Sequence, residues 1–374
     1  MAPVTVLITL MSLEIGGAET HAVVLARHLK ELGYRVIMAS AGGVFEKTIA
    51  GYGIKHYRLP LDNSRLHSLY RSVVGIRSII KSESVNLVHA HARIPAFVSD
   101  LASRLTGIHM ITTAHAMFTT GFFLRYLSRW GEKTIVVSSD IKEHMIKFFG
   151  LAESNIILIP NGIDIENFDP ALPVGGFADL KGGSDKTLIF YVSRLDDLLA
   201  PVVINLIKAC DRLYDEFPFI RLLIAGDGKC AWKVADRARV VNARTGADLI
   251  RLLGARTDIN KIMATADLIV GVSRVALEAM ASGRNVILAG GEGYGGLIQE
   301  GSLPLFVNDN FTGRQFNNKA TVQDFENTIR EFLCLPVESK RHMSLLLREF
   351  IVENYSSARM AKETAGVYEK VLNT

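Results

Sequence analysis

The sequence predicts an α/β protein built from two successive doubly wound domains with parallel sheets. Apolar runs alternate with amphipathic stretches along almost all of the 374 residues, and the alternation lapses around Pro160–Gly183 into Pro, Gly, Asn and Asp. A chain of this length is too long for one ordinary core and about right for two. Strand–helix–strand order produces right-handed parallel crossovers, and such sheets bind ligands at the carboxyl ends of their strands.

Buried strands and amphipathic helices alternate through the first half. Short runs of branched apolar residues predict the strands, and apolar residues repeated every three or four positions predict the helices. The predicted strands are Val4–Leu10, Arg35–Ser40, Asn86–His89, Met110–Ala114 and Thr134–Ser138. The predicted helices are Glu19–Leu32, Leu66–Lys81, Ile94–Leu105 and Ser139–Phe149.

The same alternation restarts after the loop-like stretch at Pro160–Gly183, which is typical of a linker. The predicted strands there are Leu188–Val192, Arg221–Ala225, Leu249–Leu253, Asp267–Val270 and Asn285–Ala289. The predicted helices are Pro201–Glu216, Asp258–Ala264, Arg274–Ser282, Val322–Leu333, Glu338–Glu353 and Ser356–Leu372. We therefore expect one domain over residues 1–170, a second over 171–355 and a separate last helix over 356–374.

Composition excludes several classes of protein. Hydrophobic residues make up 49% and charged residues 21%, which is typical of a globular chain. No window of 18 consecutive apolar residues exists, so we expect no membrane-spanning helix. The apolar start Val4–Met11 lacks a preceding basic region and a cleavage site, which favours a strand over a signal peptide. Three unpatterned cysteines (Cys210, Cys230 and Cys334) favour a reducing cytosol.

Positive charge is concentrated in part of the first half. Residues 51–150 hold 13 lysines and arginines against 6 acidic residues. This excess indicates either an anionic partner or a solvated basic face. Nucleic acid is not an expected partner, because no nucleic-acid motif accompanies the pI near 8.8.

The stretch Thr113–Lys133 mixes aromatic and basic residues. Its members are Phe118, Phe122, Phe123, Tyr126 and Trp130, with Arg125, Arg129 and Lys133. Such a stretch can lie on an anionic membrane, or it can be a buried helix whose arginines extend to solvent, and both interpretations stay open.

Two features of the first half could carry chemistry. Gly16 and Gly17 lie between the first strand and its helix, where glycine lets backbone approach a ligand and helix N–H groups can bind an anion. A plain tight turn explains them equally well. His115 ends the strand Met110–Ala114, so it should lie at a ligand-binding edge or serve as a structural histidine. A metal site made by His89, His91 and His115 is a weaker alternative, because no carboxylate or cysteine lies at ligand spacing.

The second half offers a site for an anion. Arg194 follows the strand Leu188–Val192, and its planar fork suits a phosphate, although a surface ion pair is the plainer explanation. Ser273 is a natural N-cap for the next helix, which would leave the N–H groups of Val275 and Ala276 free for a phosphate. Glu278 shares a helix face with Arg274, so the two either form an ion pair or leave the carboxylate to accept ribose hydroxyls.

Taken in order, these segments resemble the family 4 retaining glycosyltransferases of the GT-B fold over essentially the whole chain. The segments that carry the resemblance are Gly16–Glu19 with His21–Leu32, Val88–His91, Thr113–His115, Ile159–Asp164, Ser193–Leu195, Leu223–Gly228, Leu252–Gly254, Ala266–Asp267 and Leu277–Gly283. The resemblance implies two Rossmann-like domains facing an interdomain cleft. It also implies a last helix that crosses back to brace the first domain.

The resemblance also implies an activity and roles for the residues. A sugar would pass from a nucleoside diphosphate sugar to an acceptor, with retention at the anomeric carbon and without a metal. The basic first half and the stretch Thr113–Lys133 favour a cell-envelope, lipid-linked or glycan acceptor. Glu278 would bind the ribose, Arg194 the diphosphate, and backbone at Gly254 with neighbouring Arg256 would meet the base. Gly16 and Gly17 would border the reacting centre, and His115 would contact the donor sugar. The enzyme would be cytoplasmic, with the inner face of the membrane as a further site.

Two positions depart from the family pattern. The family usually carries a lysine followed by glycine where this chain has Leu199 and Ala200, so one cation at the diphosphate is absent. It also carries a second glutamate where this chain has Val270. We expect Arg274 to supply the lost positive charge.

Two other functions remain open. The absent lysine and glutamate favour a binding or scaffold protein that kept the fold and lost catalysis, whereas the retained Arg194, Glu278, Gly17 and His115 argue against it. A nucleotide-sugar 2-epimerase is a weaker alternative. The donor base, the sugar, the acceptor and the oligomeric state do not follow from the sequence.

Overall fold

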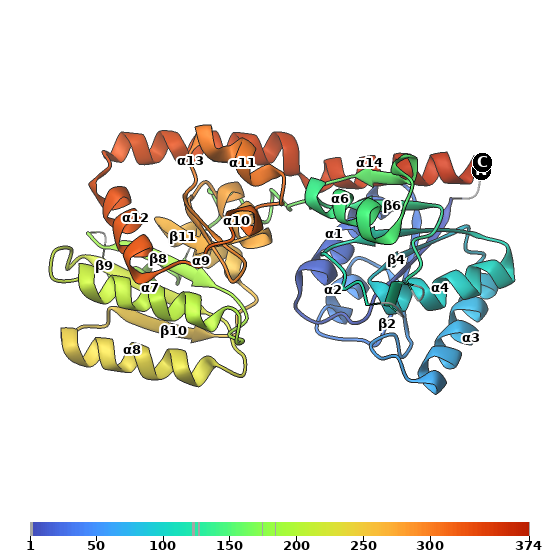
Figure 1. The fold of residues 1–374 in the computed structure, drawn as a ribbon, viewed down its shortest axis with the longest axis horizontal. Coiled ribbons are helices and arrows are strands. Elements are labelled where there is room, and N and C mark those ends of the chain that lie inside the picture. The colour runs from blue at the N-terminus through green and yellow to red at the C-terminus, as the bar shows by residue number, and fades with distance from the viewer. Residues whose placement is uncertain (1–2, 122–123, 126–127, 174, 184, 374) are drawn as a thin grey trace. The chain divides into compact units, whose positions relative to one another are not determined.

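The computed structural model describes residues 3–121, 124–125, 128–173, 175–183 and 185–373. The chain divides into two compact units (Figure 1). Unit 1 comprises Met1–Gly162 together with Ser357–Thr374, and unit 2 comprises Ile163–Ser356. The loop-like stretch expected at Pro160–Gly183 therefore falls almost entirely in unit 2. Each unit is a doubly wound α/β domain, so the predicted fold class is confirmed.

Unit 1 contains a parallel sheet in which the described strands have the order β3-β2-β1-β4-β5-β6-β7. The strands are β1 (Thr5–Thr9), β2 (Arg35–Ser40), β3 (Lys55–Arg58), β4 (Leu87–His91), β5 (His109–Ala114), β6 (Lys133–Val136) and β7 (Ile156–Leu158). Residues Thr5–Thr9 are buried on both faces, as the unbroken apolar run predicts for a central parallel strand. The strand order reverses between β1 and β4, which is where doubly wound sheets bind ligands.

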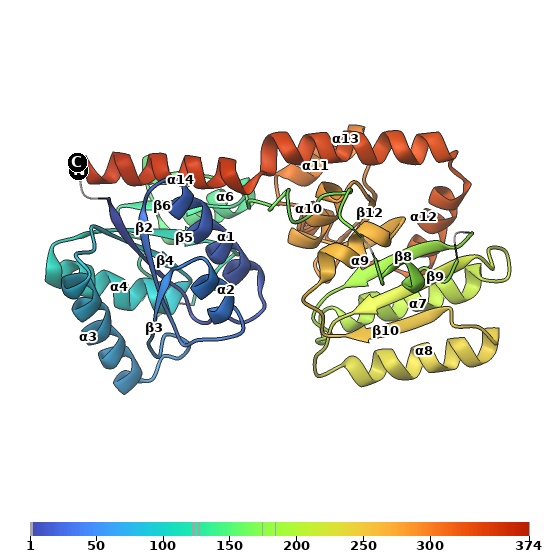
Figure 2. The same ribbon diagram turned by 180° about the vertical axis from the view of Figure 1, so that it is seen from behind.

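Helices cover both faces of this sheet (Figures 1 and 2). One face packs against α1 (Gly17–Glu31), α2 (Glu46–Gly51) and α14 (Ser357–Leu372), and the other against α3 (Leu66–Ser82) and α4 (Arg93–Thr106). Helix α6 (Ser139–Phe149) packs beside β6, and a short 3-10 turn, Glu153–Asn155, precedes β7. The C-terminal helix α14 lies along α1. The chain thus leaves unit 1 after Gly162 and returns to it at Ser357.

Unit 2 repeats the plan with the strand order β10-β9-β8-β11-β12-β13. The strands are β8 (Thr187–Val192), β9 (Ile220–Ala225), β10 (Ile250–Gly254), β11 (Leu268–Gly271), β12 (Asn285–Ala289) and the antiparallel edge strand β13 (Tyr294–Leu297). One face packs against α7 (Ala200–Leu213), α8 (Ala231–Thr245) and α12 (Val322–Cys334). The other packs against α9 (Ile259–Thr265), α10 (Arg274–Ala281), α11 (Leu303–Val307) and α13 (Val337–Tyr355). Three 3-10 turns complete the unit, at Ala178–Leu180, Glu300–Ser302 and Arg314–Phe316.

None of the described helices is both long enough and apolar enough to cross a membrane.

Candidate active site

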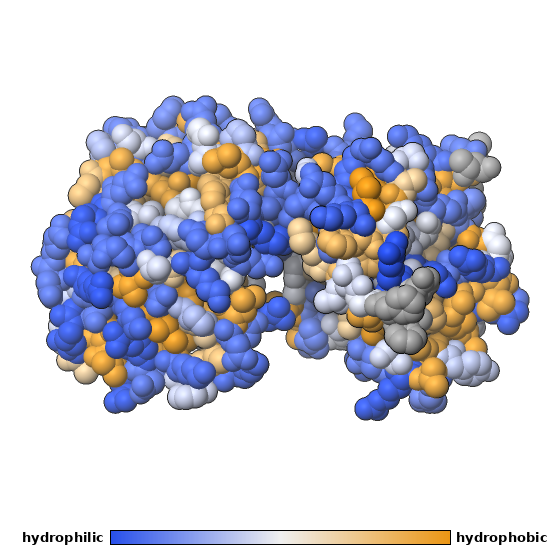
Figure 3. Space-filling view, viewed as in Figure 1, coloured by the Kyte–Doolittle hydropathy of each residue, from blue (hydrophilic) through white to orange (hydrophobic). Residues whose placement is uncertain are grey.

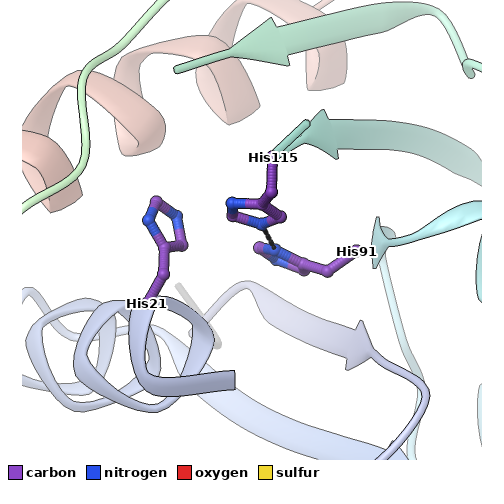
Figure 4. A group of neighbouring side chains, drawn as sticks. All are labelled: His21, His91 and His115. Atoms are coloured by element: carbon purple, nitrogen blue, oxygen red, sulfur yellow. Dashed lines mark hydrogen bonds between the residues drawn. The ribbon is translucent and has the colours of Figure 1, made fainter. Parts of the chain in front are cut away.

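Three histidines of unit 1 lie close together at the carboxyl ends of its strands. His91 ends β4, His115 follows β5 directly, and His21 lies in the second turn of α1. The parallel register pairs His91 with Thr113, which brings the carboxyl ends of β4 and β5 side by side. The three rings converge in Figure 4, although β4, β5 and α1 are separate elements. Parallel pairing thus gathers residues that are far apart in the sequence.

Hydrogen bonds and ring contacts order this histidine cluster. His91 Nδ1 and His115 Nε2 share a hydrogen bond of 2.9 Å (Figure 4). His21 Nδ1 lies 3.1 Å from Asn161 Oδ1, in the segment after β7. The rings of His21 and His115 meet edge to face, with centroids 4.7 Å apart. These contacts hold the His115 imidazole in one orientation at the edge of the sheet where ligands bind.

The metal alternative of the sequence analysis needs a correction. His89 is fully buried, and both its ring nitrogens have partners: Tyr368 Oη at 2.7 Å from Nδ1 and Thr113 Oγ1 at 2.7 Å from Nε2. His89 therefore has no nitrogen left for a metal. Among the described residues, His21 instead joins His91 and His115 with ligand nitrogens within 4.8 Å of one another. The 2.9 Å hydrogen bond occupies one nitrogen of His91 and one of His115, so a metal shared through those nitrogens would have to break it.

Gly16 and Gly17 lie at the start of α1. Gly16 is the N-cap of α1, with extended backbone at φ −166° and ψ 161°. A Cβ added at Gly17 would meet no heavy atom within 4 Å. Packing among the described residues therefore does not require glycine at position 17. A ligand that approaches the backbone closely is a reason for glycine there that agrees with the sequence expectation.

Burial keeps His89, His91 and His115 neutral. It lowers the pKa of His89 from 6.5 to about 3 and that of His115 from 6.5 to about 4, and it lowers the pKa of His91 well below 6.5. The physical cause is that water stabilises a charged imidazolium better than a protein interior does. A neutral ring can accept a hydrogen bond from a sugar hydroxyl or donate one to it.

These lowered values predict how stability depends on pH. Below pH 6.5 the unfolded chain protonates these rings while the folded protein does not, so the unfolded state binds more protons. The neutral rings therefore contribute fully to the free energy of unfolding above pH 6.5. This contribution falls as the pH falls toward 4, by up to about 1.4 kcal/mol per pH unit for each ring. Urea unfolding of wild type and His115→Asn measures this slope, which we expect to be smaller in the variant. An identical slope in both proteins would contradict the prediction.

The acidic group Glu83 does not mask this window. The pKa of Glu83 is lowered from 4.5 to about 2 by hydrogen bonds from Lys55, Tyr57 and Arg35. Its contribution to stability is present above pH 4.5 and is lost only as the pH falls from there toward 2. The histidine slope can therefore be measured before that loss begins.

In unit 2, Arg194 lies where the sequence places it. It follows β8, whose neighbours in the sheet are β9 and β11, so it occupies the point at which the strand order reverses. Its side chain is exposed, and no acidic partner for it occurs among the described residues. A guanidinium without an ion pair can bind phosphate oxygens without first breaking a bond inside the protein.

The start of α10 is close to the sequence expectation, with one difference. Ser273 is the N-cap, but its side chain makes no capping hydrogen bond. The Val275 N–H donates to Val272 O at 3.1 Å. It is therefore not free, whereas the sequence predicted a free donor. The Ala276 N–H, which a capping serine would normally engage, has no acceptor among the described residues. It remains a donor for an anion, together with the positive end of the helix dipole.

Backbone strain marks the same place in both units. Ser273, before α10, has φ 50°, and Ala92, before α4, has φ 90°. Both residues lie one or two positions after the strand that neighbours the first strand of their sheet, β11 for Ser273 and β4 for Ala92. Left-handed backbone is costly for residues other than glycine and is often stored at functional sites.

Glu278 and Arg274 form the ion pair that was one of the two predicted alternatives. Arg274 Nε lies 2.7 Å from Glu278 Oε1, and both side chains are largely buried. Burial raises the pKa of Glu278, and the charge and hydrogen bond of Arg274 lower it. The carboxylate is therefore held beside the helix N-terminus by a cation that could also contact a phosphate.

The remaining positions differ in how open they are to a ligand. Gly254 ends β10 with φ 66°, and a Cβ there would meet nothing within 4 Å. Arg256 is paired with Asp258 at 2.8 Å. Val270 is fully buried within β11, so this position faces the core instead of a ligand. Leu199 is the half-buried N-cap of α7.

Sequence reasoning missed His21 and Asn161 as members of the site. Both lie in segments that carried the family resemblance, His21–Leu32 and Ile159–Asp164, and that was the one signal available. Their contact joins α1 to the segment after β7, and no spacing in the sequence reveals a contact between residues so far apart.

Comparison with known proteins agrees with this architecture. Residues 15–167 match the family model described as Glycosyltransferase Family 4, and residues 186–333 match the model described as Glycosyl transferases group 1. The phosphatidylinositol N-acetylglucosaminyltransferase GPI3 subunit of Saccharomyces cerevisiae is 22% identical over 96% of this chain and 81% of its own length. The two family models together cover most of the chain, one in each unit.

Solved structures share the fold. A glycosyltransferase from Rickettsia africae has a TM-score of 0.79 at 21% identity and covers 100% of this chain and 99% of its own. Anabaena HepE in complex with UDP and glucose has a TM-score of 0.74 at 19% identity and covers 97% and 99%. The chain is therefore a family 4 glycosyltransferase-like protein with the GT-B fold.

Proposed function

We propose that the protein is a retaining glycosyltransferase that moves a sugar from a nucleoside diphosphate sugar to a cell-envelope, lipid-linked or glycan acceptor. The observation that carries the proposal is the presence of a basic and an acidic residue near the point in unit 2 at which the strand order reverses. Arg194 follows β8 without a described acidic partner, and Glu278 lies on α10 two residues after Ala276, whose N–H is open. A diphosphate and a ribose need these groups in one place.

In this proposal the two units have different tasks. Unit 2 binds the nucleotide: Arg194 and the N-terminus of α10 stabilise the departing diphosphate, Glu278 accepts hydrogen bonds from the ribose, and Gly254 leaves room for the base. Unit 1 binds the acceptor, and its neutral His115 and the open Gly17 contact the reacting sugar. The phosphate takes the acceptor's proton, so no metal and no protein nucleophile are required.

Two comparisons support the choice of substrates. HepE was solved with UDP and glucose, which favours a uridine nucleotide as the first donor to test. The yeast relative is named for transfer of N-acetylglucosamine to phosphatidylinositol, which favours a lipid acceptor.

The test is incubation of the protein with UDP-N-acetylglucosamine or UDP-glucose and either phosphatidylinositol or a bacterial lipid extract. Transfer is detected by mass spectrometry, and the anomeric configuration of the product by NMR. We expect a product with the donor's anomeric configuration, formed equally with or without EDTA. Inversion would contradict the retaining mechanism, and loss of activity in EDTA would contradict the metal-independent one.

A binding or scaffold protein is the second candidate. It is favoured by Leu199 and Val270, which replace the family's lysine and glutamate with apolar side chains. Absence of any transfer, combined with absence of nucleotide binding, would favour this candidate.

Arg274 separates the two candidates further. We expect Arg274→Ala to weaken nucleoside diphosphate binding by one to two orders of magnitude, because a hydrogen bond to a charged group contributes about 1.5–3 kcal/mol. Arg274→Lys retains the charge and should recover part of the affinity. Calorimetric titration measures both. Binding as tight as wild type in Arg274→Ala would show that Arg274 serves only as the ion-pair partner of Glu278.

A further inference from the structure

His91 is enclosed within unit 1 and has one ring nitrogen without a described partner. Hydrophilic and hydrophobic side chains are mixed over the outer surface of unit 1 (Figure 3), whereas the His91 side chain is fully buried. Its Nδ1 shares the 2.9 Å hydrogen bond with His115 Nε2. Its Nε2 is also buried and has no hydrogen-bond partner among the described residues. Within the described part of the chain, the bond to His115 is therefore the one that the His91 ring makes.

The neighbouring ring of His89 does not offer that nitrogen a partner. The ring centroids of His89 and His91 lie 4.2 Å apart, but both nitrogens of His89 are engaged, one with Tyr368 Oη and the other with Thr113 Oγ1. Burial lowers the pKa of His91 well below 6.5 and that of His115 to about 4. Each of these two rings is therefore neutral and carries one proton, on one nitrogen or the other.

The stretch Thr113–Lys133, which contains His115, does not provide this partner through its described residues either. Phe122, Phe123 and Tyr126 lie outside the described residues. Trp130 packs edge to face against Phe118 and Phe149, with ring centroids 5.3 Å and 5.0 Å away. These rings pack on a core cluster of unit 1, which favours the alternative of a buried segment for this part of the stretch.

The hydrogen bond between His91 and His115 can be made in two ways. A neutral imidazole has one N–H and one nitrogen with a lone pair. If His91 Nδ1 donates, its Nε2 carries the lone pair, and His115 holds its own proton on Nδ1. If His115 Nε2 donates instead, the proton of His91 lies on Nε2, where it is buried without a described acceptor. A buried N–H without an acceptor is rarer in proteins than an acceptor without a donor, so the first arrangement is favoured.

We propose that His91 is a positioning residue that fixes His115 in the tautomer with the proton on Nδ1. His115 is half-buried and its Nε2 is occupied by His91, so Nδ1 is the ring nitrogen that can reach a ligand. In this tautomer His115 donates a hydrogen bond and does not accept one. Its partner is then a hydroxyl or phosphate oxygen of the donor, and not an N–H group or a cation. The use of this contact in sugar transfer rests on the proposed function, whereas the tautomer itself does not.

The experiment is NMR of the full chain with ¹⁵N-labelled histidine, at neutral pH and without substrate. A protonated ring nitrogen and one with a lone pair have well-separated ¹⁵N shifts, so each ring reports its tautomer. The spectra of His91→Asn and His115→Asn assign the signals. We expect the proton on Nδ1 in both rings. A free imidazole slightly prefers the proton on Nε2, so the exposed His67 should give the opposite pattern and serves as the internal control.

Two substitutions of similar size separate positioning from packing. In His91→Asn the amide can still donate to His115 Nε2, so we expect the proton of His115 to stay on Nδ1 and transfer to remain within about threefold of wild type. In His91→Leu the donor is lost. We expect His115 to adopt both tautomers and transfer to fall about tenfold, the factor that one net hydrogen bond provides. Thermal unfolding checks that both variants are folded.

The outcomes separate this inference from the proposed function. The spectrum of the wild type needs neither a substrate nor a folded variant, so it decides the tautomer even if wild type transfers no sugar, in which case the proposed function alone fails. A proton on Nε2 of His115 in wild type would overturn the inference. An unchanged His115 tautomer in His91→Leu, or an equal loss of transfer in both variants, would also overturn it, because His91 would then serve packing alone.

Discussion

Replacing Arg194 with alanine is expected to weaken nucleoside diphosphate binding by at least one to two orders of magnitude. A charge-assisted hydrogen bond contributes about 1.5–3 kcal/mol, and a guanidinium can donate two such bonds to a diphosphate at once. The fold should not change, because Arg194 is exposed and has no acidic partner among the described residues. Calorimetric titration with nucleoside diphosphate gives the affinity, and thermal unfolding verifies the fold.

A control for this prediction exists in the same unit. Arg251 lies on β10 and is also exposed, but it is within the strand and not at a carboxyl end. Arg251→Ala should bind nucleotide as tightly as wild type. If Arg194→Ala keeps its affinity, or if Arg251→Ala loses as much, the diphosphate site is not where we place it.

Replacing Tyr368 with alanine is expected to lower the free energy of unfolding of unit 1 by about 3–5 kcal/mol, the usual cost of truncating a large side chain in a core. Tyr368 is fully buried on α14 and meets the ring of Tyr34 edge to face at 5.8 Å. Its hydroxyl lies 2.7 Å from His89 Nδ1. The substitution therefore leaves a cavity and a buried nitrogen without its partner. Urea unfolding followed by circular dichroism measures the loss.

Two further variants separate these effects. Tyr368→Phe removes the hydroxyl and keeps the ring, so it should cost about 1–3 kcal/mol for the unsatisfied histidine. Tyr70→Ala, on the exposed side of α3, should change stability by less than about 0.5 kcal/mol. Stability of Tyr368→Ala close to wild type would mean that α14 does not brace unit 1.

The sequence predicts the central strands well and misses the edge strands β3 and β13. Central strands such as β1 and β12 are unbroken apolar runs, because both faces are buried. Edge strand β3 reads Lys-His-Tyr-Arg and was not predicted, since an edge strand with a solvated face carries no apolar run. Edge strand β13 contains two consecutive glycines, which disfavour a strand by propensity. Tertiary pairing with β2 and β12 decides these two cases.

Helix α8 was also missed, for a related reason. It buries only Val234, Ala238 and Val241, and most of its other side chains are polar or charged. An apolar residue every three or four positions on an otherwise polar stretch is a weak signal. The helix is stabilised by packing on α7 and β10, which pattern analysis does not include.

The sequence could predict those site residues whose position depends on the end of a single strand or helix. Arg194, Ser273 and Glu278 follow or begin elements whose ends the sequence shows, so their positions could be predicted from strand and helix boundaries. The partners of His115 and the pairing of Arg256 with Asp258 depend on contacts across elements or on loop geometry. Ser273 also has a partner from another part of the chain, because its N–H donates to Phe311 O in a distant turn.

The measurement that tests the central claim most directly is calorimetric titration of the wild type with UDP, GDP, ADP, CDP and dTDP, repeated with Arg194→Ala and Glu278→Ala. We predict binding of one nucleotide in the micromolar range, lost in both variants. That result would establish a donor site at the carboxyl ends of β8 and β11 and would identify the base. Absence of binding by all five nucleotides would contradict the account and favour a scaffold protein in which Leu199 and Val270 have ended catalysis.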